Sequence, residues 1–579
     1  MKKSNPIKTL LFALTIVLLF VSLLQKEIKM FHFKPLGGVI ESTHKPKLSF
    51  EAFSSSKYQT NLEGYLKENF GFREPLIRFY NQYLWDFYGK TYVSKGSVSI
   101  GKDGWLYEPW CVDDYCQVYF HRYAEDADEM ASLLSTEAKR IYQLQCVLEQ
   151  YGTHLFVSLV PAKDLIYPEY LPEIKETKYD NQKKFSARFF NEQEYSRLGV
   201  NHLNLEQWFL QMKDTADFFL FPKTGTHWSN YACLYATDTL VRYMEHLGDC
   251  NLKNIVIGPR ELDEARSPDD DLEKMLNLIR PLPKPKYYYA VADTDNDTLA
   301  SKTKLITIGD SFWWNIVGKM PMNKIFSEYP FWYYNSTIYY GEPYHSTKEI
   351  DLLEELLSAD FITLFFSAPQ QYKMNCGFTE RALLALCFDP QEVDSVKNSI
   401  KTTINNDPNW MKKLEDRAQS KNISLDIIVD EEVNSFIENN IEKYFPTLLD
   451  SVPKSRNPRN DELAIIKKIK KDSKWMVAMH CQATVQKLPL KDILKAEANN
   501  VLNNRPLMRD MTEGVSRETY IEGLVRNLME ELRGKPLRIE QIKEKAKKNH
   551  KSFEEQLEAD ARWVINDKMQ KGEIVWEEE

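Results

Sequence analysis

Basic residues are in deficit in this 579-residue sequence. It holds 75 Lys and Arg against 84 Asp and Glu, which gives a formal net charge of −9. A nucleic-acid-binding surface neutralises phosphates with a dense basic face, so this charge balance argues against nucleic acid as a partner. The hydrophobic content of 43% is ordinary for a folded protein. The length favours two or three domains.

Metal-ligand spacing is missing as well. None of the eight cysteines lies in a Cys-x-x-Cys motif, and no Cys and His residues cluster with the spacing of a zinc site. His480 and Cys481 are adjacent, but they lie in a helical pattern that favours core packing. We therefore predict no structural metal and no cofactor. Cys111 and Cys116 share one loop, where they either close a small disulfide or stay as free thiols.

The N-terminal region lacks a cleavage site. An uncharged run, Thr9 to Leu24, follows Lys2, Lys3 and Lys8, but neither a small-x-small site nor a cysteine-containing lipobox comes after it. At about 1.5 Å per residue the run spans roughly 24 Å, and flanking lysines can snorkel to extend it. We expect an uncleaved, single-pass anchor over residues 1–25, with the body exported. A signal sequence and a buried core helix are the alternatives.

Helices alternate with short buried strands after a polar neck at 26–59. This alternation predicts a mostly parallel α/β sheet with helices on both faces, which we place at 60–390. Apolar runs predict strands at 154–160, 200–205, 304–308 and 361–366. Amphipathic periodicity predicts helices at 124–151, 183–198, 229–247 and 347–357.

Residues 395–579 have almost no strand patterns and repeat themselves at a spacing near 65 residues. Trp410 and Trp475 stand at equivalent points of two copies, and a third, degenerate copy has Arg538 where tryptophan would be. The repeat predicts an all-α extension in which each copy is a helix-turn-helix that buries its apolar face against its neighbours. Three amphipathic helices that match by chance are the alternative. Nothing in this region resembles a catalytic motif.

A Gly-Asp-Ser tripeptide ending at Ser311 follows the strand at 304–308. Ligand sites of α/β folds form at the carboxyl ends of parallel strands, so this serine is a candidate nucleophile. The same tripeptide is also a common turn, in which Asp310 shapes the backbone. His227 precedes the helix at 229–247 and is a candidate general base for the serine.

Four motifs occur in a fixed order: GKDGWLY at 101–107, VPAKDLIYPEYLP at 160–172, GTHWS at 225–229 and IGDSF at 308–312. Together they resemble the AlgJ/AlgX-type SGNH hydrolase-like family of bacterial polysaccharide O-acetylation proteins. In that family the histidine motif precedes the serine motif, as it does here.

The resemblance implies that Ser311 accepts an acetyl group and that His227 acts as its base. The acceptor would be an exported polysaccharide, and the acetyl source a membrane-bound O-acyltransferase partner. The chain would be anchored in the inner membrane with its catalytic domain in the periplasm. A carbohydrate O-acetylesterase and a non-catalytic glycan-binding or scaffold protein are the alternatives.

One position departs from the family pattern, which has an aspartate two residues before the histidine. This chain has Gly225 there. Because the acid of a triad orients the imidazole, either a backbone carbonyl or another carboxylate orients His227, or the activity is weak or lost. If the backbone tolerates a side chain, Gly225→Asp is expected to raise turnover.

Further side chains are candidates for the oxyanion hole or for contacts with substrate. The backbone N–H of Ser311 is the first oxyanion donor, with the amides of Asn315 and Asn335 as alternatives; Lys163, Trp228 and Asp310 complete the set. Aromatic residues could line a sugar cleft or fill the core: Trp313, Trp314, Trp332, Tyr333 and Tyr334.

Overall fold

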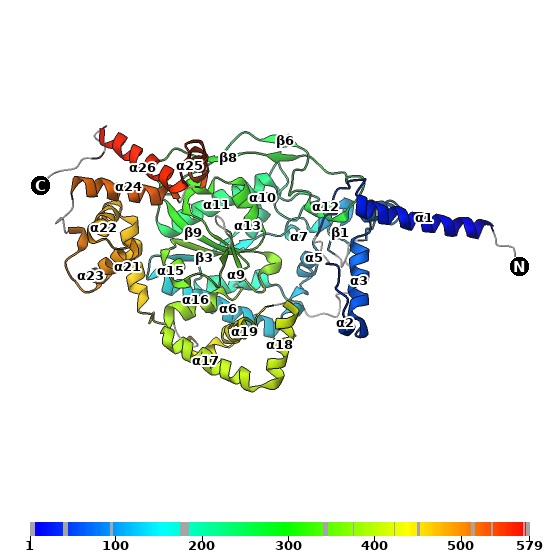
Figure 1. Cartoon of the computed structure of the whole chain (residues 1–579), viewed down its shortest axis with the longest axis horizontal. Coiled ribbons are helices and arrows are strands. Elements are labelled where there is room, and N and C mark those ends of the chain that lie inside the picture. The colour runs from blue at the N-terminus through cyan, green and yellow to red at the C-terminus, as the bar shows by residue number, and fades with distance from the viewer. Residues whose placement is uncertain are drawn as a thin grey trace.

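An α/β body occupies the centre of the computed structural model, with helix α1 projecting from one end and C-terminal helices at the other (Figure 1). The structure describes residues 6–38, 44–92, 97–173, 184–339, 345–374, 376–421, 423–448, 452–510, 516–533, 536–570 and 574.

A mostly parallel sheet forms the core of the body, as predicted. Its strand order is β13-β12-β11-β9-β14-β3-β4, with β10 paired to β9. The pairs from β11 to β4 are parallel, and β12 and β13 extend the sheet antiparallel at one edge. The strands are β3 (His154–Val160), β4 (His202–Asn204), β9 (Thr303–Gly309), β10 (Phe326–Glu328), β11 (Phe331–Tyr333), β12 (Thr337–Tyr339), β13 (His345–Ser346) and β14 (Phe361–Ser367).

Helices cover both faces of this sheet. α6, α9, α15 and α16 pack on one face and α10, α11 and α13 on the other. The strands are buried on both sides, which explains why β3, β9 and β14 are continuous apolar runs in the sequence. The helices are α6 (Ala127–Glu149), α9 (Ala187–Leu198), α10 (Leu205–Lys213), α11 (Asn230–Gly248), α13 (Phe312–Lys319), α14 (Met322–Ile325), α15 (Leu352–Ser358) and α16 (Phe378–Cys387).

The helices begin at their caps rather than where the apolar periodicity starts. Asp126 accepts hydrogen bonds from two backbone N–H groups of the first turn of α6, and Asp351 accepts one from Glu354 in α15. An N-cap side chain satisfies donors that would otherwise have no partner. The predicted helices at 124–151 and 347–357 therefore begin later than expected.

An insertion between α11 and β9 carries short elements that the sequence analysis did not predict. They are β5 (Ile255–Ile257), β6 (Glu261–Asp263), α12 (Asp271–Leu276), β7 (Tyr287–Tyr289) and β8 (Ala292–Thr294). β5 pairs with β8 and β6 with β7, both antiparallel. Between the neck and α6 lie β1 (Ser99–Ile100), β2 (Leu106–Tyr107) and α5 (Pro109–Tyr115), and α7 (Lys163–Ile166) follows β3.

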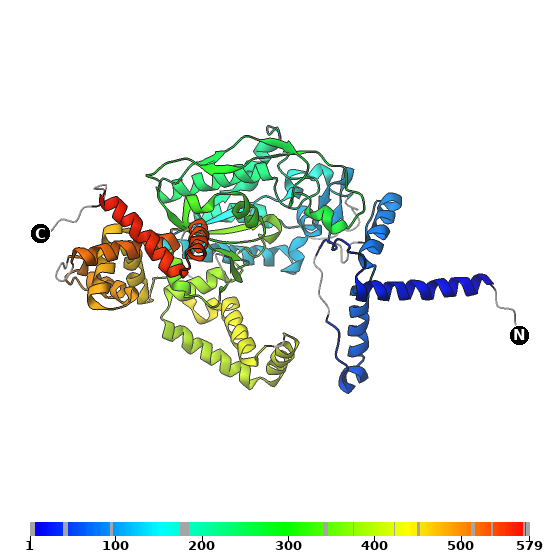
Figure 2. The ribbon, with the colours of Figure 1, turned by 45° about the horizontal axis from the view of Figure 1, so that its top comes forward.

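Helix α1 (Pro6–Ile28) extends away from the body (Figure 2). Residues Ile7–Ile28 are long and apolar enough to cross a membrane, by length and composition. The neck extends past the predicted 26–59. Its described residues form α2 (Phe50–Ser54), α3 (Lys57–Glu68) and α4 (Arg73–Tyr88), which connect α1 to the body.

The C-terminal region is all-α, but each unit has three helices rather than the expected two. The units are α17 (Pro390–Asn406) to α19 (Leu425–Asn439), α21 (Arg459–Lys471) to α23 (Leu490–Leu502), and α24 (Arg517–Arg533) to α26 (Phe553–Gln570). The remaining helices are α18 (Pro408–Lys421), α20 (Ile441–Tyr444), α22 (Ser473–Gln486) and α25 (Pro536–Lys548). In Figure 2 the first unit lies below the body and the others at its far end, so the copies do not form one stack.

The same side-chain contact occurs within each of the first two units. The indole N–H of Trp410 donates to Glu432 at 3.0 Å, and that of Trp475 donates to Glu497 at 2.8 Å. In both units the acceptor lies 22 residues after the tryptophan. The two tryptophans therefore have the same structural role.

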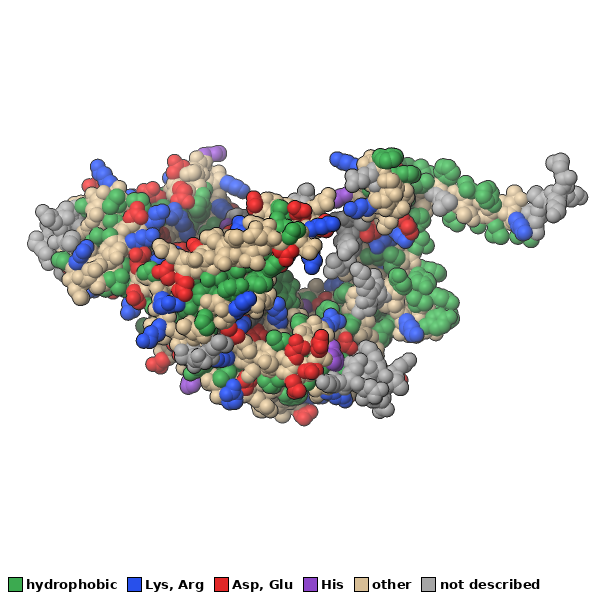
Figure 3. Space-filling model, turned by 90° about the horizontal axis from the view of Figure 1, so that it is seen from below, with side chains coloured by type: hydrophobic (Ala, Val, Ile, Leu, Met, Phe, Trp, Pro, Cys, Tyr) green, Lys and Arg blue, Asp and Glu red, His purple; other side chains and the backbone are tan. Residues whose placement is uncertain are grey.

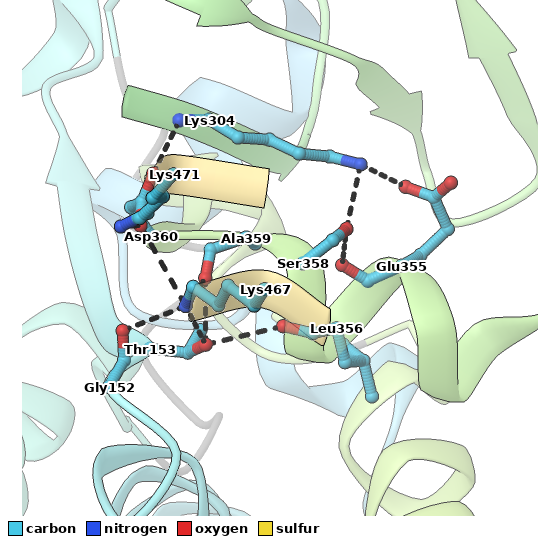
Figure 4. A network of polar contacts seen from close by, with 10 residues as sticks. All are labelled: Gly152, Thr153, Lys304, Glu355, Leu356, Ser358, Ala359, Asp360, Lys467 and Lys471. Carbon is cyan, nitrogen blue, oxygen red and sulfur yellow. Dashed lines mark hydrogen bonds and ion pairs between the residues drawn. The ribbon is translucent and has the colours of Figure 1, made fainter. Parts of the chain in front are cut away.

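Polar contacts attach the second unit to the body (Figure 4). Lys467 of α21 donates to the carbonyls of Gly152 and Ala359, at 2.9 and 2.5 Å, and Lys471 pairs with Asp360. Asp360 also accepts from the backbone N–H of Lys304 at 2.8 Å. These body residues lie where β3, β14 and β9 begin, so α21 covers the amino ends of the strands and leaves the carboxyl ends open.

Candidate active site

Ser311 and His227 meet at the carboxyl edge of the sheet. β9 ends at Gly309, and the chain turns into α13 through Ser311; His227 lies in the loop before α11. The His227 Nε2 atom is 2.9 Å from the Ser311 Oγ atom. An imidazole at this distance can take the hydroxyl proton, which is the arrangement of a nucleophile and its base.

Asp310 holds the turn that presents Ser311. Its Oδ1 atom accepts a hydrogen bond from the Phe312 N–H at 3.0 Å. Its Oδ2 atom accepts from the backbone N–H and the hydroxyl of Ser367, at 2.7 and 2.6 Å. The carboxyl group ties the end of β9 to the end of β14, and burial raises its pKa. Asp310 is buried and fully engaged, so it shapes the turn and does not contact substrate.

A carboxylate from the insertion approaches the other side of His227. The Asp271 Oδ2 atom lies 3.3 Å from His227 Nδ1. Its Oδ1 atom accepts from the N–H groups of Thr226 and Leu272, at 2.8 and 2.7 Å, which directs Oδ2 at the imidazole. The contact is long and poorly aligned for a hydrogen bond, and among the described residues Nδ1 has no hydrogen-bond partner. Catalytic hydrogen bonds are often long in unliganded sites and shorten when substrate binds.

Gly225 stands where the related family has its acid, and the structure leaves no room there for a side chain. A Cβ atom on Gly225 would lie 2.7 Å from the carbonyl oxygen of Asp269 and 2.8 Å from Pro222 Cγ. The segment that brings Asp271 to His227 therefore passes through the space an acid at 225 would need. The backbone at position 225 therefore does not tolerate a side chain, and the gain in turnover expected from Gly225→Asp should not occur.

We now expect Gly225→Asp to lower stability and turnover. Overpacking against a backbone carbonyl typically costs about 1–3 kcal/mol, and the displaced segment carries Asp271. Gly225→Ala adds only the Cβ atom and should show the same direction. Gly64→Ala in α3 is the matched control, because a Cβ there meets nothing within 4 Å. Denaturant unfolding measures the effect, and a Gly225→Ala chain as stable as Gly64→Ala would contradict it.

Lys163 does not face the cleft, contrary to the prediction. It is only 3% exposed. Its ammonium group donates to the carbonyls of Leu106, Lys223 and Gly225, at 2.6, 3.1 and 2.6 Å. All three protons are used by the backbone, so Lys163 positions the histidine loop against β2 and cannot contact substrate.

Trp228 was another candidate for substrate contact, and the structure places it in the core. It is fully buried, with its ring 5.4 Å from that of Phe312 and 6.1 Å from that of Phe365. Trp313 and Trp332 are also fully buried. The tryptophan after His227 supports the floor of the site from beneath.

The two asparagine candidates lie in different places. Asn315 of α13 lines the same cleft as Ser311, and its Oδ1 atom accepts from Lys319 at 3.2 Å. The Asn335 amide donates to the Cys376 carbonyl at 3.1 Å and lines a separate cavity of about 620 Å³. Asn315 therefore stays a candidate oxyanion donor, and Asn335 does not.

A cleft of about 690 Å³ opens beside Ser311 and His227. The start of α13 forms one wall, and the insertion forms the other. Trp314 is 38% exposed and lines the first wall, and Tyr289 lines the second. An exposed ring such as that of Trp314 can stack on a sugar face. The Tyr289 ring is buried, with the Arg266 guanidinium 4.4 Å from its centroid, so it forms part of the wall. Tyr333 and Tyr334 are partly buried and pack on each other at 4.7 Å.

Glu108 was not a candidate in the sequence, yet its charge interacts with the site. It precedes α5, and its Oε2 atom accepts from the Trp110 indole at 3.1 Å. Burial raises the pKa of Glu108 to about 7; nearby His227 opposes this shift, and Asp271 adds to it. Around neutral pH this carboxyl group changes charge next to the imidazole.

The raised pKa of Glu108 predicts a pH-dependent contribution to stability. Between its ordinary pKa of 4.5 and about 7, the folded chain keeps a proton that the unfolded chain has lost. The unfolding free energy therefore falls as pH rises through this window, by at most about 3 kcal/mol from this group.

Glu108→Gln removes that titration. Urea unfolding from pH 5 to 8 should show a shallower loss of stability for the variant than for the wild-type chain. Identical slopes for the two chains would contradict the assignment.

The structure has no disulfide between Cys111 and Cys116. Within the described residues, no group of three or more His, Cys, Asp or Glu side chains is arranged to hold a metal ion.

Comparison with known proteins finds one family model that matches part of the α/β body. A family model described as the SGNH hydrolase-like domain of acetyltransferase AlgX matches residues 98–307. The match includes His227 and Asp271 and ends in β9, just before Ser311. No curated protein sequence matches the chain.

Solved structures of low identity are similar to part of this chain. The O-acetyltransferase domain of Pseudomonas putida AlgJ is 15% identical, with 48% of this chain and 92% of that chain covered and a TM-score of 0.31. Pseudomonas aeruginosa AlgX is 9% identical, with 47% and 61% covered and a TM-score of 0.29. Bacillus cereus PatB1 is 11% identical, with 42% and 93% covered and a TM-score of 0.27. Residues 98–307, which lie in the α/β body, therefore match an SGNH hydrolase-like domain of the AlgX type.

Proposed function

We propose that the chain is a serine-dependent O-acetyltransferase that acts on an exported polysaccharide. Ser311 is the nucleophile, His227 the general base and Asp271 the carboxylate that orients the imidazole. The observation that carries this proposal is the 2.9 Å contact between His227 Nε2 and Ser311 Oγ at the cleft of an AlgX-type domain.

In the first half-reaction, His227 Nε2 takes the hydroxyl proton as Ser311 Oγ attacks the carbonyl carbon of an acetyl donor. The tetrahedral oxyanion is stabilised by the Ser311 N–H at the start of α13 and by the Asn315 amide. The imidazolium then gives its proton to the leaving group. The product is an acetyl ester on Ser311.

In the second half-reaction a sugar hydroxyl replaces the leaving group. His227 Nε2 takes the proton of that hydroxyl, and its oxygen attacks the acetyl-serine carbonyl. Collapse of the second oxyanion transfers the acetyl group to the sugar and returns the proton to Ser311. Asp271 stabilises the imidazolium formed in each half-reaction.

Trp314 supports a sugar acceptor, because its exposed ring lines one wall of the cleft. The apolar helix α1 and the AlgX-type domain support an anchored protein whose body lies outside the cytoplasm. We propose the inner membrane as the site of the anchor and a membrane-bound O-acyltransferase as the source of acetyl groups.

An assay with p-nitrophenyl acetate tests the proposal on the detergent-solubilised full chain. Release of nitrophenol should depend on Ser311 and should accelerate when an oligosaccharide acceptor is added, with acetyl groups appearing on the sugar. Release without transfer to any sugar would favour the esterase alternative. Release at equal rates from wild type and Ser311→Ala would overturn both enzymatic assignments.

A further inference from the structure

Helix α4 in the neck exposes large apolar side chains to solvent. They recur at helical spacing, so they form one stripe. This aromatic stripe consists of Leu76, Phe79, Tyr80, Tyr83 and Phe87, each 45–71% exposed. A contiguous exposed stripe of large apolar side chains marks an interaction surface.

The face of α4 that packs on the body combines Trp85, which contacts an apolar cluster, with two buried amides. Asn81 donates to the Leu276 carbonyl at 2.8 Å, and Gln82 accepts from the Ile279 and Arg280 N–H groups at 3.1 and 3.0 Å. Both amides are buried. Because these contacts fix one face of α4 against the body, the aromatic stripe faces away from it.

The base of α1 packs on the turn between α3 and α4. A Cβ atom on Gly71 in that turn would lie 2.2 Å from the Ser22 carbonyl oxygen, and Lys26 lies over the Tyr65 ring at 4.6 Å. In Figure 2, α3 and α4 run across the direction of α1, between α1 and the body. If α1 crosses a membrane, these two helices lie along its surface.

The length of α1 brings the neck close to the membrane. Because Ser22 already packs on the neck, only the segment from Ile7 to Val21 projects freely. At about 1.5 Å per residue this segment spans roughly 22 Å, less than the hydrocarbon core of about 30 Å. Immersing the neck about 5–10 Å into the interfacial region makes up the difference.

We propose that the aromatic stripe of α4 binds the lipid bilayer interface beside α1. Phe and Tyr side chains suit this region, where an apolar ring meets hydrated headgroups. Figure 3 shows hydrophobic side chains gathered at the end of the body from which α1 projects. Insertion of α1 and interfacial binding of the aromatic stripe together hold the body in a fixed position at the membrane.

This inference rests on the proposed membrane insertion of α1, and the test separates the two. The photoreactive residue p-benzoylphenylalanine replaces Phe79 or Phe87 in the full chain, reconstituted in vesicles of phosphatidylethanolamine and phosphatidylglycerol. Phe189 of α9 is the matched control position, because it is a 54% exposed phenylalanine on the body. Alkaline carbonate washing reports insertion of α1, and mass spectrometry after irradiation reports lipid adducts.

We expect a carbonate-resistant chain with several-fold more lipid adduct at positions 79 and 87 than at 189. A carbonate-resistant chain with equal adduct at all three positions would overturn the interfacial contact and leave the anchor intact. Release by carbonate would overturn both. Irradiation of native membranes provides the second arm, in which adducts to a protein instead of lipid at 79 and 87 would assign the stripe to a protein partner.

Discussion

Ser311→Ala and His227→Gln are each expected to reduce acetyl turnover by about 10⁴-fold or more. The serine supplies the attacking oxygen, and the histidine makes that oxygen nucleophilic, so neither residue acts without the other. The double variant should therefore be no slower than the slower single variant.

Steady-state release of acetate or nitrophenol measures these losses. Ser336→Ala is the matched control, because this exposed serine also lies beyond a strand of the sheet and donates only to the Tyr333 carbonyl. A double variant whose loss is the product of the two single losses would show that the residues act independently, contrary to the proposed pair.

Asp271→Asn is expected to lower kcat by about 10²–10⁴-fold with little change in KM. The amide keeps the shape of the side chain but loses the negative charge that stabilises the imidazolium. We expect the loss of kcat to be smaller than the roughly 10⁴-fold loss of a strict triad. The reason is that the Asp271–His227 contact is 3.3 Å in the unliganded chain.

Two readouts separate positioning of His227 from a merely structural role of Asp271. Loss of the carboxylate should lower kcat and leave KM nearly unchanged, because its charge stabilises the imidazolium formed during the reaction and takes no part in substrate binding. Asp270→Asn is the control, since that carboxylate pairs with Lys274 at 2.7 Å instead. Equal losses of kcat in the two variants, or a loss in Asp271→Asn that appears mainly in KM, would contradict the assignment.

Much of the fold was predictable because its strands are buried on both faces. The predicted strand at 154–160 coincides with β3, and those at 304–308 and 361–366 lie within one residue of β9 and β14 at each end. The contact between Ser311 and His227 was expected from the motifs, and the structure brings these two side chains together.

Asp271 could not be assigned from the sequence. It lies in an acid-rich run, Asp269 to Asp271, 44 residues after His227, and no spacing rule connects such a run to a histidine. Only the folding of the insertion brings it to the imidazole. Gly225 indicated that another segment passes close to the histidine loop. A glycine at a crowded position marks a close approach of two backbone segments.

Trp228 and Lys163 show a second limit of prediction from sequence motifs. Both lie in motifs next to site residues, yet one fills the core and the other binds three backbone carbonyls. A motif shows which residues occur together, but it does not show which of them face the substrate and which hold the site in place.

The central claim is that Ser311 carries the acetyl group between donor and acceptor. The full chain should be incubated with excess acetyl ester donor and no sugar, quenched in acid, digested and analysed by mass spectrometry. We predict one acetyl group on Ser311 in the wild-type chain, its loss when an oligosaccharide acceptor is added before quenching, and none in the His227→Gln variant. Turnover of the donor with Ser311 unmodified, or with the acetyl group on another side chain, would contradict the account.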